Sequence, residues 1–152
     1  MKRFLLLALA LAMTVTSAGQ SGRAISGSGT LYLTYDIGMG NGTEGVLIAR
    51  FVPDAASLPH FPAVTTGEYP GPVSYISLMP TRQVLEAVVG TDEAARLMRD
   101  PMRIVQIPAQ VVLQNYQAVV ECDARTYNAT LASVKPLGPY QVATRANAPI
   151  GC

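Results

Sequence analysis

The sequence predicts a small β-rich α+β domain, an antiparallel barrel or sheet of five to six strands with one helical hairpin between strands three and four. Two observations predict this class. Apolar and polar residues alternate with a period of two in several segments, which is typical of half-buried strands. One segment in the middle of the chain instead has apolar residues at helical spacing and the capping residues of two short helices. Hydrophobic residues make up 49% of the 152 residues, which is enough for the core of one domain.

The first two strands are predicted on either side of a glycine-rich loop. In residues 30–37, Leu31 and Leu33 fall on one face, and the threonines and a tyrosine between them fall on the other. Residues 46–52 are mostly apolar and are expected to return along the first strand. The loop contains the pattern GxGxxG at residues 40–45. A dinucleotide site needs a helix after this pattern, whereas a strand pattern follows here, so a hairpin loop is predicted.

A long proline-rich segment, residues 53–72, separates the second strand from a third one predicted at residues 73–78. Loops of this length are usually functional or disordered. Prolines lower the entropy cost of presenting a loop to a partner, and His60, Phe61 and Tyr69 are the candidate contact side chains. The segment is therefore either a partner-binding loop or a passive, ordered surface loop.

A helical hairpin is predicted next. Thr81 can cap a first helix that Gly90 closes, and Thr91 can cap a second helix that Pro101 stops. A DNA-binding helix-turn-helix would need a basic second helix, but acidic residues oppose the few arginines of this one. The hairpin is therefore predicted to be structural.

Strand patterns return after Pro101 and continue almost to the end of the chain. The predicted strands are residues 102–107, residues 110–122 with a bend near Gln114–Asn115, residues 126–134 after a hairpin connection at 123–125, and a short strand within 140–144.

The order of elements is three strands, a helical hairpin, and two or three strands. A five-stranded barrel of the OB type also has its helix between strands three and four, so an OB-like topology fits this order. A generic α+β sheet with a helix on one face fits nearly as well. Neither architecture conveys a function by itself.

The N-terminus has the order of a secretory signal peptide. Lys2 and Arg3 are basic, residues 4–15 are almost entirely apolar, and small residues follow up to Ala18. A membrane anchor is the alternative, but this apolar stretch is shorter than the roughly 20 residues of a spanning helix. We expect cleavage before Gly19, and a secreted, periplasmic or cell-envelope protein without a membrane span.

Cleavage leaves a flexible start at residues 19–29 and a single domain at residues 30–152. Loss of Lys2 and Arg3 leaves nine basic and ten acidic residues, so the mature chain is nearly neutral and has no electrostatic attraction to nucleic acid. Two cysteines, Cys122 and Cys152, are predicted to form a disulfide bond because an even number in an exported chain favours pairing. Two free thiols, or a catalytic Cys122, are the alternatives.

Few residues could carry catalysis. A Ser–His or Cys–His hydrolase would have to use His60, the only histidine. The same histidine with Cys122 and Cys152 lacks the close spacing of a zinc site. Glu121 and Asp123 would share a strand face about 7 Å apart and could act as paired carboxylates, but a solvated face is the simpler interpretation. No metal and no cofactor are predicted.

Two tripeptides match the N-glycosylation sequence, beginning at Asn41 and Asn128, and we expect both to be unmodified. The sequence therefore favours an exported, non-catalytic binding or envelope-associated domain whose partner is an extracytoplasmic protein or a small ligand. The alternatives are a small exported hydrolase or thiol enzyme that uses His60 or Cys122, and an inhibitor that presents the loop at residues 53–72.

Overall fold

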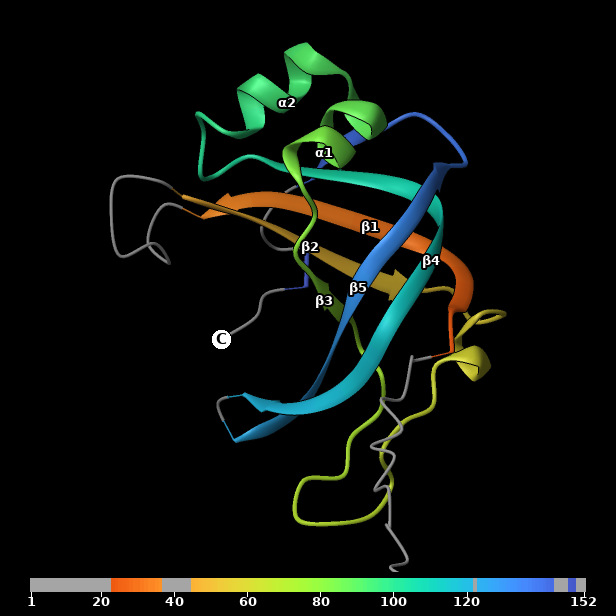
Figure 1. Ribbon diagram of the computed structural model, residues 1–152. Helices are drawn as coiled ribbons and strands as arrows, with labels where there is room; N and C mark the ends of the chain where they lie inside the picture. The colour runs from red at the N-terminus through yellow and green to blue at the C-terminus, as the bar shows by residue number, and fades with distance from the viewer. Residues whose placement is uncertain (1–22, 37–44, 122, 144–147, 150–152) are drawn as a thin grey trace, which may run out of the picture.

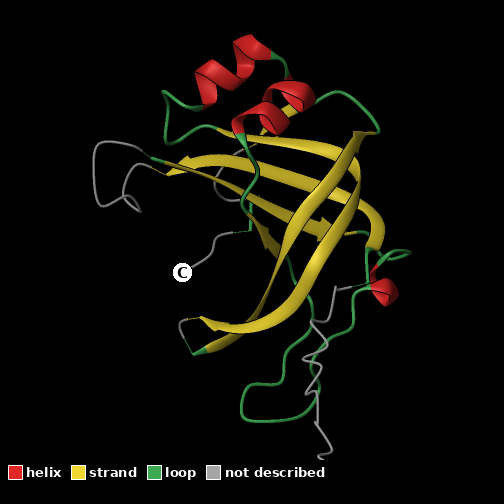
Figure 2. Cartoon of the chain, viewed as in Figure 1, coloured by secondary structure: helices red, strands yellow, loops and turns green. Residues whose placement is uncertain are grey.

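The computed structural model describes residues 23–36, 45–121, 123–143 and 148–149. Its core is a β-barrel covered at one end by two short helices (Figures 1 and 2). The elements are β1 (Ile25–Asp36), β2 (Val46–Pro53), the short 3-10 helix η1 (Leu58–His60), β3 (Ile76–Leu78), α1 (Arg82–Val89), α2 (Thr91–Leu97), β4 (Ile104–Glu121), β5 (Ala124–Pro136) and β6 (Gln141–Ala143).

Five strands form a closed ring in the order β1–β2–β3–β5–β4, and β4 pairs with β1 to complete it. This order, with the helices between β3 and β4, confirms the β-rich fold class and the OB-like arrangement of strands. The sheet is mixed rather than wholly antiparallel, because β3 and β5 run parallel while the other ladders are antiparallel. The chain reaches β5 from β3 through two helices and β4, and such a long crossover allows two neighbouring strands to run in the same direction.

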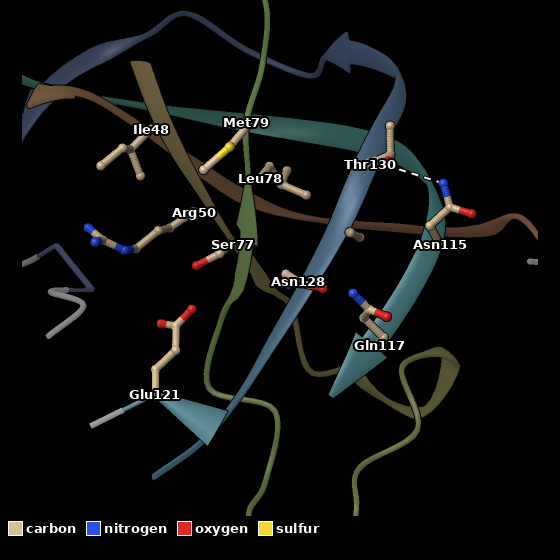
Figure 3. Close-up of a pocket in the computed structure, with 11 residues that line it drawn as sticks. Ile48, Arg50, Ser77, Leu78, Met79, Asn115, Gln117, Glu121, Asn128 and Thr130 are labelled. Atoms are coloured by element: carbon tan, nitrogen blue, oxygen red, sulfur yellow. Dashed lines mark hydrogen bonds between the residues drawn. The ribbon is translucent and has the colours of Figure 1, made fainter. Parts of the chain in front are cut away.

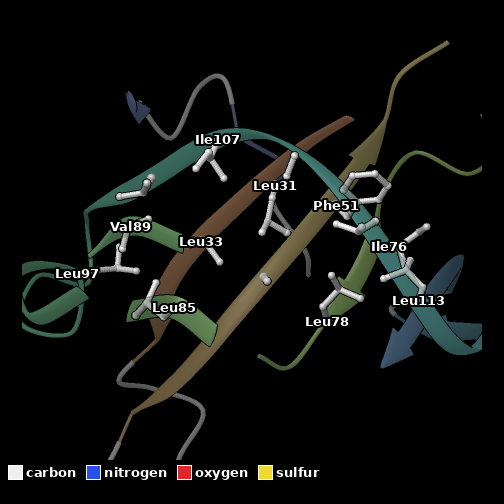
Figure 4. Close-up of a cluster of buried hydrophobic side chains, with 14 of the residues drawn as sticks. Leu31, Leu33, Phe51, Ile76, Leu78, Leu85, Val89, Leu97, Ile107 and Leu113 are labelled. Carbon is white, nitrogen blue, oxygen red and sulfur yellow. The ribbon is translucent and has the colours of Figure 1, made fainter. Parts of the chain in front are cut away.

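The helical hairpin closes one end of the barrel through apolar side chains. Leu85 of α1 and Leu97 of α2 are completely buried and pack into the same cluster as Leu33 of β1 (Figure 4). The hydroxyl of Thr81 accepts a hydrogen bond from the Val84 amide at 3.3 Å, as its capping role predicts.

Thr91 is not a cap, which corrects the prediction for the second helix. Gly90 has a positive φ of 84° and serves as the C-cap of α1 and the N-cap of α2, so α2 begins at Thr91 itself. A glycine adopts this backbone conformation without steric cost, which lets one residue join the two helices.

The expected flexible start at residues 19–29 is wrong for residues 25–29, because β1 begins at Ile25 and pairs with β4. The small residues there permit close packing. A Cβ atom on Gly29 would lie 2.2 Å from the carbonyl oxygen of Val52, and one on Gly27 would lie 2.7 Å from the ring of Phe61. Glycines that look like a linker in the sequence are therefore sites of close approach.

The two strands predicted on either side of Pro108 are one continuous strand, β4. Pro108 lacks an amide hydrogen, which usually ends a central strand. Here the Pro108 carbonyl accepts a hydrogen bond from the Leu137 amide at 2.7 Å. On this side of β4, the pairing with β6 ends at Gln106 and the pairing with β5 begins at Ala109, so Pro108 lies between the two ladders. The missing donor thus falls at an interruption of the ladder.

The predicted bend in β4 is confirmed. The register with β5 shifts between Gln114 and Gln117, and Asn115 has a positive φ of 52°. Such a bulge turns the strand and re-aims its side chains.

No helix of the described residues is long and apolar enough to cross a membrane. The predicted signal peptide, residues 1–18, lies outside the described residues.

Candidate binding face

A pocket of about 400 Å³ lies on the outer face of the sheet, across β2, β3, β5 and the last part of β4 (Figure 3). Its lining is mostly apolar and also carries amide, hydroxyl and charged groups. The lining residues are Ile48, Arg50, Ser77, Leu78, Met79, Asn115, Gln117, Glu121, Asn128, Ala129 and Thr130.

The strand register places four polar lining residues in one line. Arg50 of β2 pairs with Ser77 of β3, Ser77 pairs with Asn128 of β5, and Asn128 pairs with Gln117 of β4. We call these four residues the outer row. Adjacent strands are spaced about 4.8 Å apart, so the outer row extends about 14 Å across the sheet.

The outer row lies on the outside of the barrel because of the period-two alternation of each strand. Ala49, Ile76 and Tyr127, which each stand beside a member of the row in the chain, are at most 1% exposed and belong to the core. The sheet therefore carries an apolar face inside the barrel and the outer row on its outside, where the pocket lies.

The bulge in β4 contributes to the pocket wall. Asn115 donates a hydrogen bond through Nδ2 to the hydroxyl of Thr130 at 3.3 Å. Asn115 and Gln117 both line the pocket, because residues two apart lie on the same face of a strand. Amide and hydroxyl groups can donate and accept hydrogen bonds, so this wall suits a polar ligand.

Arg50 has a distinctive environment within the pocket lining. Its Nη1 donates to the carbonyl oxygen of Pro149 at 3.0 Å, and its guanidinium carbon lies 5.7 Å from the centre of the Tyr75 ring. Its Nε is buried and has no hydrogen-bond partner among the described residues. Two contacts thus fix the guanidinium while one of its buried donors is left unused.

The structure overturns one predicted contact residue of the proline-rich loop. Phe61 is only 2% exposed, and its ring packs 5.9 Å from Phe51 and 6.0 Å from Tyr116. An aromatic ring next to prolines in a loop suggests display, but here burial of the ring fastens the loop to the core.

His60 is exposed, and its Nδ1 lies 3.1 Å from the backbone carbonyl of Ser26. The serine hydroxyls nearby are used structurally: Ser57 Oγ accepts from the Ser28 amide at 2.8 Å, and Ser28 Oγ donates to Asp54 at 2.8 Å. The hydroxyl of Ser28 holds the pKa of the Asp54 carboxyl below its usual value. These contacts tie η1 to β1.

Tyr127 anchors the outer part of the proline-rich loop. Its hydroxyl donates to the Gly71 carbonyl at 2.7 Å and accepts from the Val64 amide at 2.8 Å, and the Gly71 amide bonds the Val64 carbonyl at 2.9 Å. Arg125 Nε also donates to the carbonyl of Tyr69, whose side chain is half-buried. Residues 65–68 between these anchors are exposed and extend beyond the barrel (Figure 1).

A second tyrosine, Tyr116, supports the same loop. It stacks on Tyr127 with ring centres 5.5 Å apart, and its hydroxyl donates to the Pro62 carbonyl at 3.1 Å. Burial raises the pKa of Tyr116 well above its usual value, so this hydroxyl stays protonated and remains a donor.

The paired-carboxylate arrangement of Glu121 and Asp123 is not formed as expected. β4 ends at Glu121, and Asp123 lies in the following turn with a positive φ of 57°, so the two residues do not share a strand face. Only Glu121 lines the outer pocket. Within the described ranges, no group of three or more His, Cys, Asp or Glu residues is placed to hold a metal ion.

Several predicted features lie outside the described residues: Cys122, Cys152, Asn41 and most of the GxGxxG loop. The β1–β2 pairing of Asp36 with Val46 nevertheless confirms that this loop joins two antiparallel strands. The other sequon residue, Asn128, belongs to the outer row and is half-buried on a strand.

Sequence reasoning missed the outer row. Alternation alone assigns Arg50, Ser77 and Asn128 to polar faces of their strands, but it does not reveal which strands become neighbours. The row depends on the parallel β3–β5 pairing, which no local pattern encodes.

Comparison of the chain with protein-family models, with curated proteins and with solved structures finds no significant match.

Proposed function

We propose that this protein is an exported, non-catalytic binding domain whose ligand site is the outer-face pocket. The observation that carries the proposal is the outer row: four strands from separate parts of the chain bring Arg50, Ser77, Asn128 and Gln117 into one line within the lining of a pocket. Pockets of about 300–1,000 Å³ with a mostly apolar lining and a few convergent polar groups are typical of small-ligand sites.

A non-catalytic role agrees with the chemistry of the face. Among the described residues that line the outer pocket there is no histidine, and Glu121 is the single carboxylate. His60, on which a hydrolase would depend, bonds a backbone carbonyl near the start of β1. The amides and hydroxyls of the face supply hydrogen bonds rather than a nucleophile and its base.

Export supports the same proposal from the sequence. The signal-like N-terminus predicts a secreted, periplasmic or cell-envelope location, and a pairing of Cys122 with Cys152 suits an oxidising compartment. The proposal also requires that Asn128 carries no glycan, because a glycan on this residue would occupy the pocket.

The experiment is an NMR titration of the ¹⁵N-labelled protein recovered after export. The probes are a defined set of amino acids, dipeptides, monosaccharides and disaccharides. We expect at least one probe to shift the amide signals of Ser77, Gln117 and Asn128 together. If every probe that binds shifts other regions only, the face is not the ligand site.

A second function, that of an inhibitor or partner-binding protein, is favoured by the anchoring of the proline-rich loop. Two tyrosines and Arg125 hold its backbone, while residues 65–68 remain exposed. A loop that is already rigid loses little entropy on binding. Grafting a glycine-serine sequence over residues 65–68 tests it: an inhibitor loses affinity for its partner, whereas ligand binding at the outer row is unchanged.

A further inference from the structure

Arg50 is a half-buried cation for which the described part of the chain provides no carboxylate. The ion pairs found there involve Arg82, Arg96 and Arg103 instead. A buried guanidinium donor without a partner is unfavourable, because it has lost its water without gaining a protein hydrogen bond. In Arg50 this donor is Nε, in a side chain that lines the outer pocket.

The unused donor belongs to the edge of the guanidinium that binds carboxylates. Nη1 is engaged by the Pro149 carbonyl, and the Tyr75 ring lies against the guanidinium at 5.7 Å. Nε and Nη2 together form the side of arginine that donates two parallel hydrogen bonds to one carboxylate. The contacts with Pro149 and Tyr75 orient the group, and because Nε is buried, a ligand carboxylate reaches this edge only after the side chain shifts.

We propose that the ligand of the outer-face pocket carries a carboxylate that pairs with Arg50, and this inference rests on the proposed function. The rest of the outer row, Ser77, Asn128 and Gln117, then binds the neutral polar part of the same molecule. Glu121 lines the same pocket and is exposed. Its charge disfavours a doubly charged group, so a carboxylate fits the pocket better than a phosphate.

The test uses two small probes that differ only in charge, N-acetylglycine and N-acetylglycinamide. Each is titrated into the ¹⁵N-labelled protein, and the Arg50 Nε–H signal, identified by its absence in Arg50→Gln, is followed with the amides of Ser77 and Asn128. We expect N-acetylglycine to bind about tenfold more tightly than N-acetylglycinamide and to shift the Nε–H signal. Added salt should weaken this preference.

Three variants separate charge recognition from folding. Arg50→Gln should abolish the preference for the carboxylate, Arg50→Lys should retain part of it, and Arg82→Gln, which changes an arginine on the surface of α1, should leave it intact. The dispersion of the amide spectrum shows whether each variant is folded. Arg50→Lys keeps the test valid if the Gln variant unfolds.

The outcomes distinguish this inference from the proposed function. If both probes shift the outer row with equal affinity, carboxylate recognition is wrong and the binding face stands. If neither probe binds but a saccharide does shift the outer row, carboxylate recognition is again wrong. If no probe of any kind shifts the outer row, both proposals fail.

Discussion

Arg50 in β2 donates a hydrogen bond through Nη1 to the carbonyl oxygen of Pro149 at 3.0 Å, although the two residues are 99 positions apart in the chain. The contact places Pro149 beside Arg50, which lines the outer-face pocket. Glu121, which lines the same pocket, directly precedes Cys122, and Cys152 follows Pro149 by three residues. Two described residues, Glu121 and Pro149, thus lie at this pocket, one residue before Cys122 and three residues before Cys152 in the sequence.

We therefore predict a disulfide bond between Cys122 and Cys152 in the exported protein. In the chain-entropy model, closing a loop of this length stabilises the folded state by about 3–4 kcal/mol. Intact mass should show alkylation of both cysteines only after reduction, and reduction should lower the melting temperature. A non-reduced protein that takes up two alkyl groups would contradict the bridge. The double variant Cys122→Ala/Cys152→Ala, whose melting temperature reductant should not change, is the control.

Gly29→Ala is expected to destabilise the protein by about 1–3 kcal/mol, the usual cost of forcing an extra group into a packed site. The added methyl group would lie 2.2 Å from the carbonyl oxygen of Val52, so the β1–β2 pairing must shift. Gly138→Ala is the control, because its nearest neighbour is at an ordinary 3.7 Å. Urea unfolding measures both. Equal stability of the two variants would argue against close packing at the start of β1.

Tyr127→Phe should cost about 1–3 kcal/mol, because it leaves the Val64 amide and the Gly71 carbonyl without their partner. Hydrogen exchange at the Gly71 amide should accelerate as the loop loosens. Tyr69→Phe serves as the control, since the contact of Tyr69 with Arg125 uses its backbone carbonyl. Slow exchange in Tyr127→Phe would mean that the loop is held by other contacts.

Stability should fall as the pH is lowered through the acid range, in part because of Glu93. This carboxylate is 3% exposed and bonds Arg103 at 2.5 Å, and that bond holds its pKa below the ordinary value of 4.5. The folded state therefore binds the proton less readily than the unfolded state. The stabilisation is complete above pH 4.5 and is lost as the pH falls through the lower, folded-state pKa.

Glu93→Gln removes this dependence. The variant should be about 1.5–3 kcal/mol less stable at neutral pH, the usual contribution of a hydrogen bond to a charged group, and its stability should change less below pH 4.5 than that of the unmodified protein. Glu86→Gln, which breaks a surface pair with Arg82, should cost about 0.5 kcal/mol or less. Urea unfolding at several pH values measures all three proteins. If the free energy of unfolding changed with pH by the same amount in the Glu93 variant and in the unmodified protein, this role of Glu93 would be contradicted.

The sequence predicted those parts of the fold that depend on local patterns. Alternation in residues 30–37 placed Leu31 and Leu33 in the core, and Thr81 capped α1 as expected. The errors arose where a residue's role is set by distant contacts. Gly29 looks flexible until its approach to Val52 is known, and Pro108 looks like a strand end until the gap in its ladder is known.

The candidate site was predictable only in its parts. Glu121 was singled out from the sequence, but as one of a catalytic pair with Asp123, and the positive φ of Asp123 removes that arrangement. Arg50, Ser77 and Asn128 become neighbours through pairings between strands that are distant in sequence. One sequence without that register cannot show that these three residues belong to one surface.

The most direct test of the account compares two variants that introduce the same bulky side chain at different places on the sheet. Ser77→Phe fills the centre of the outer row, whereas Ser133→Phe places the same ring at an exposed position of β5 outside the pocket lining. For a small molecule that binds the unmodified protein, we predict that Ser77→Phe abolishes binding and that Ser133→Phe preserves it. Undiminished binding to a folded Ser77→Phe variant would contradict it.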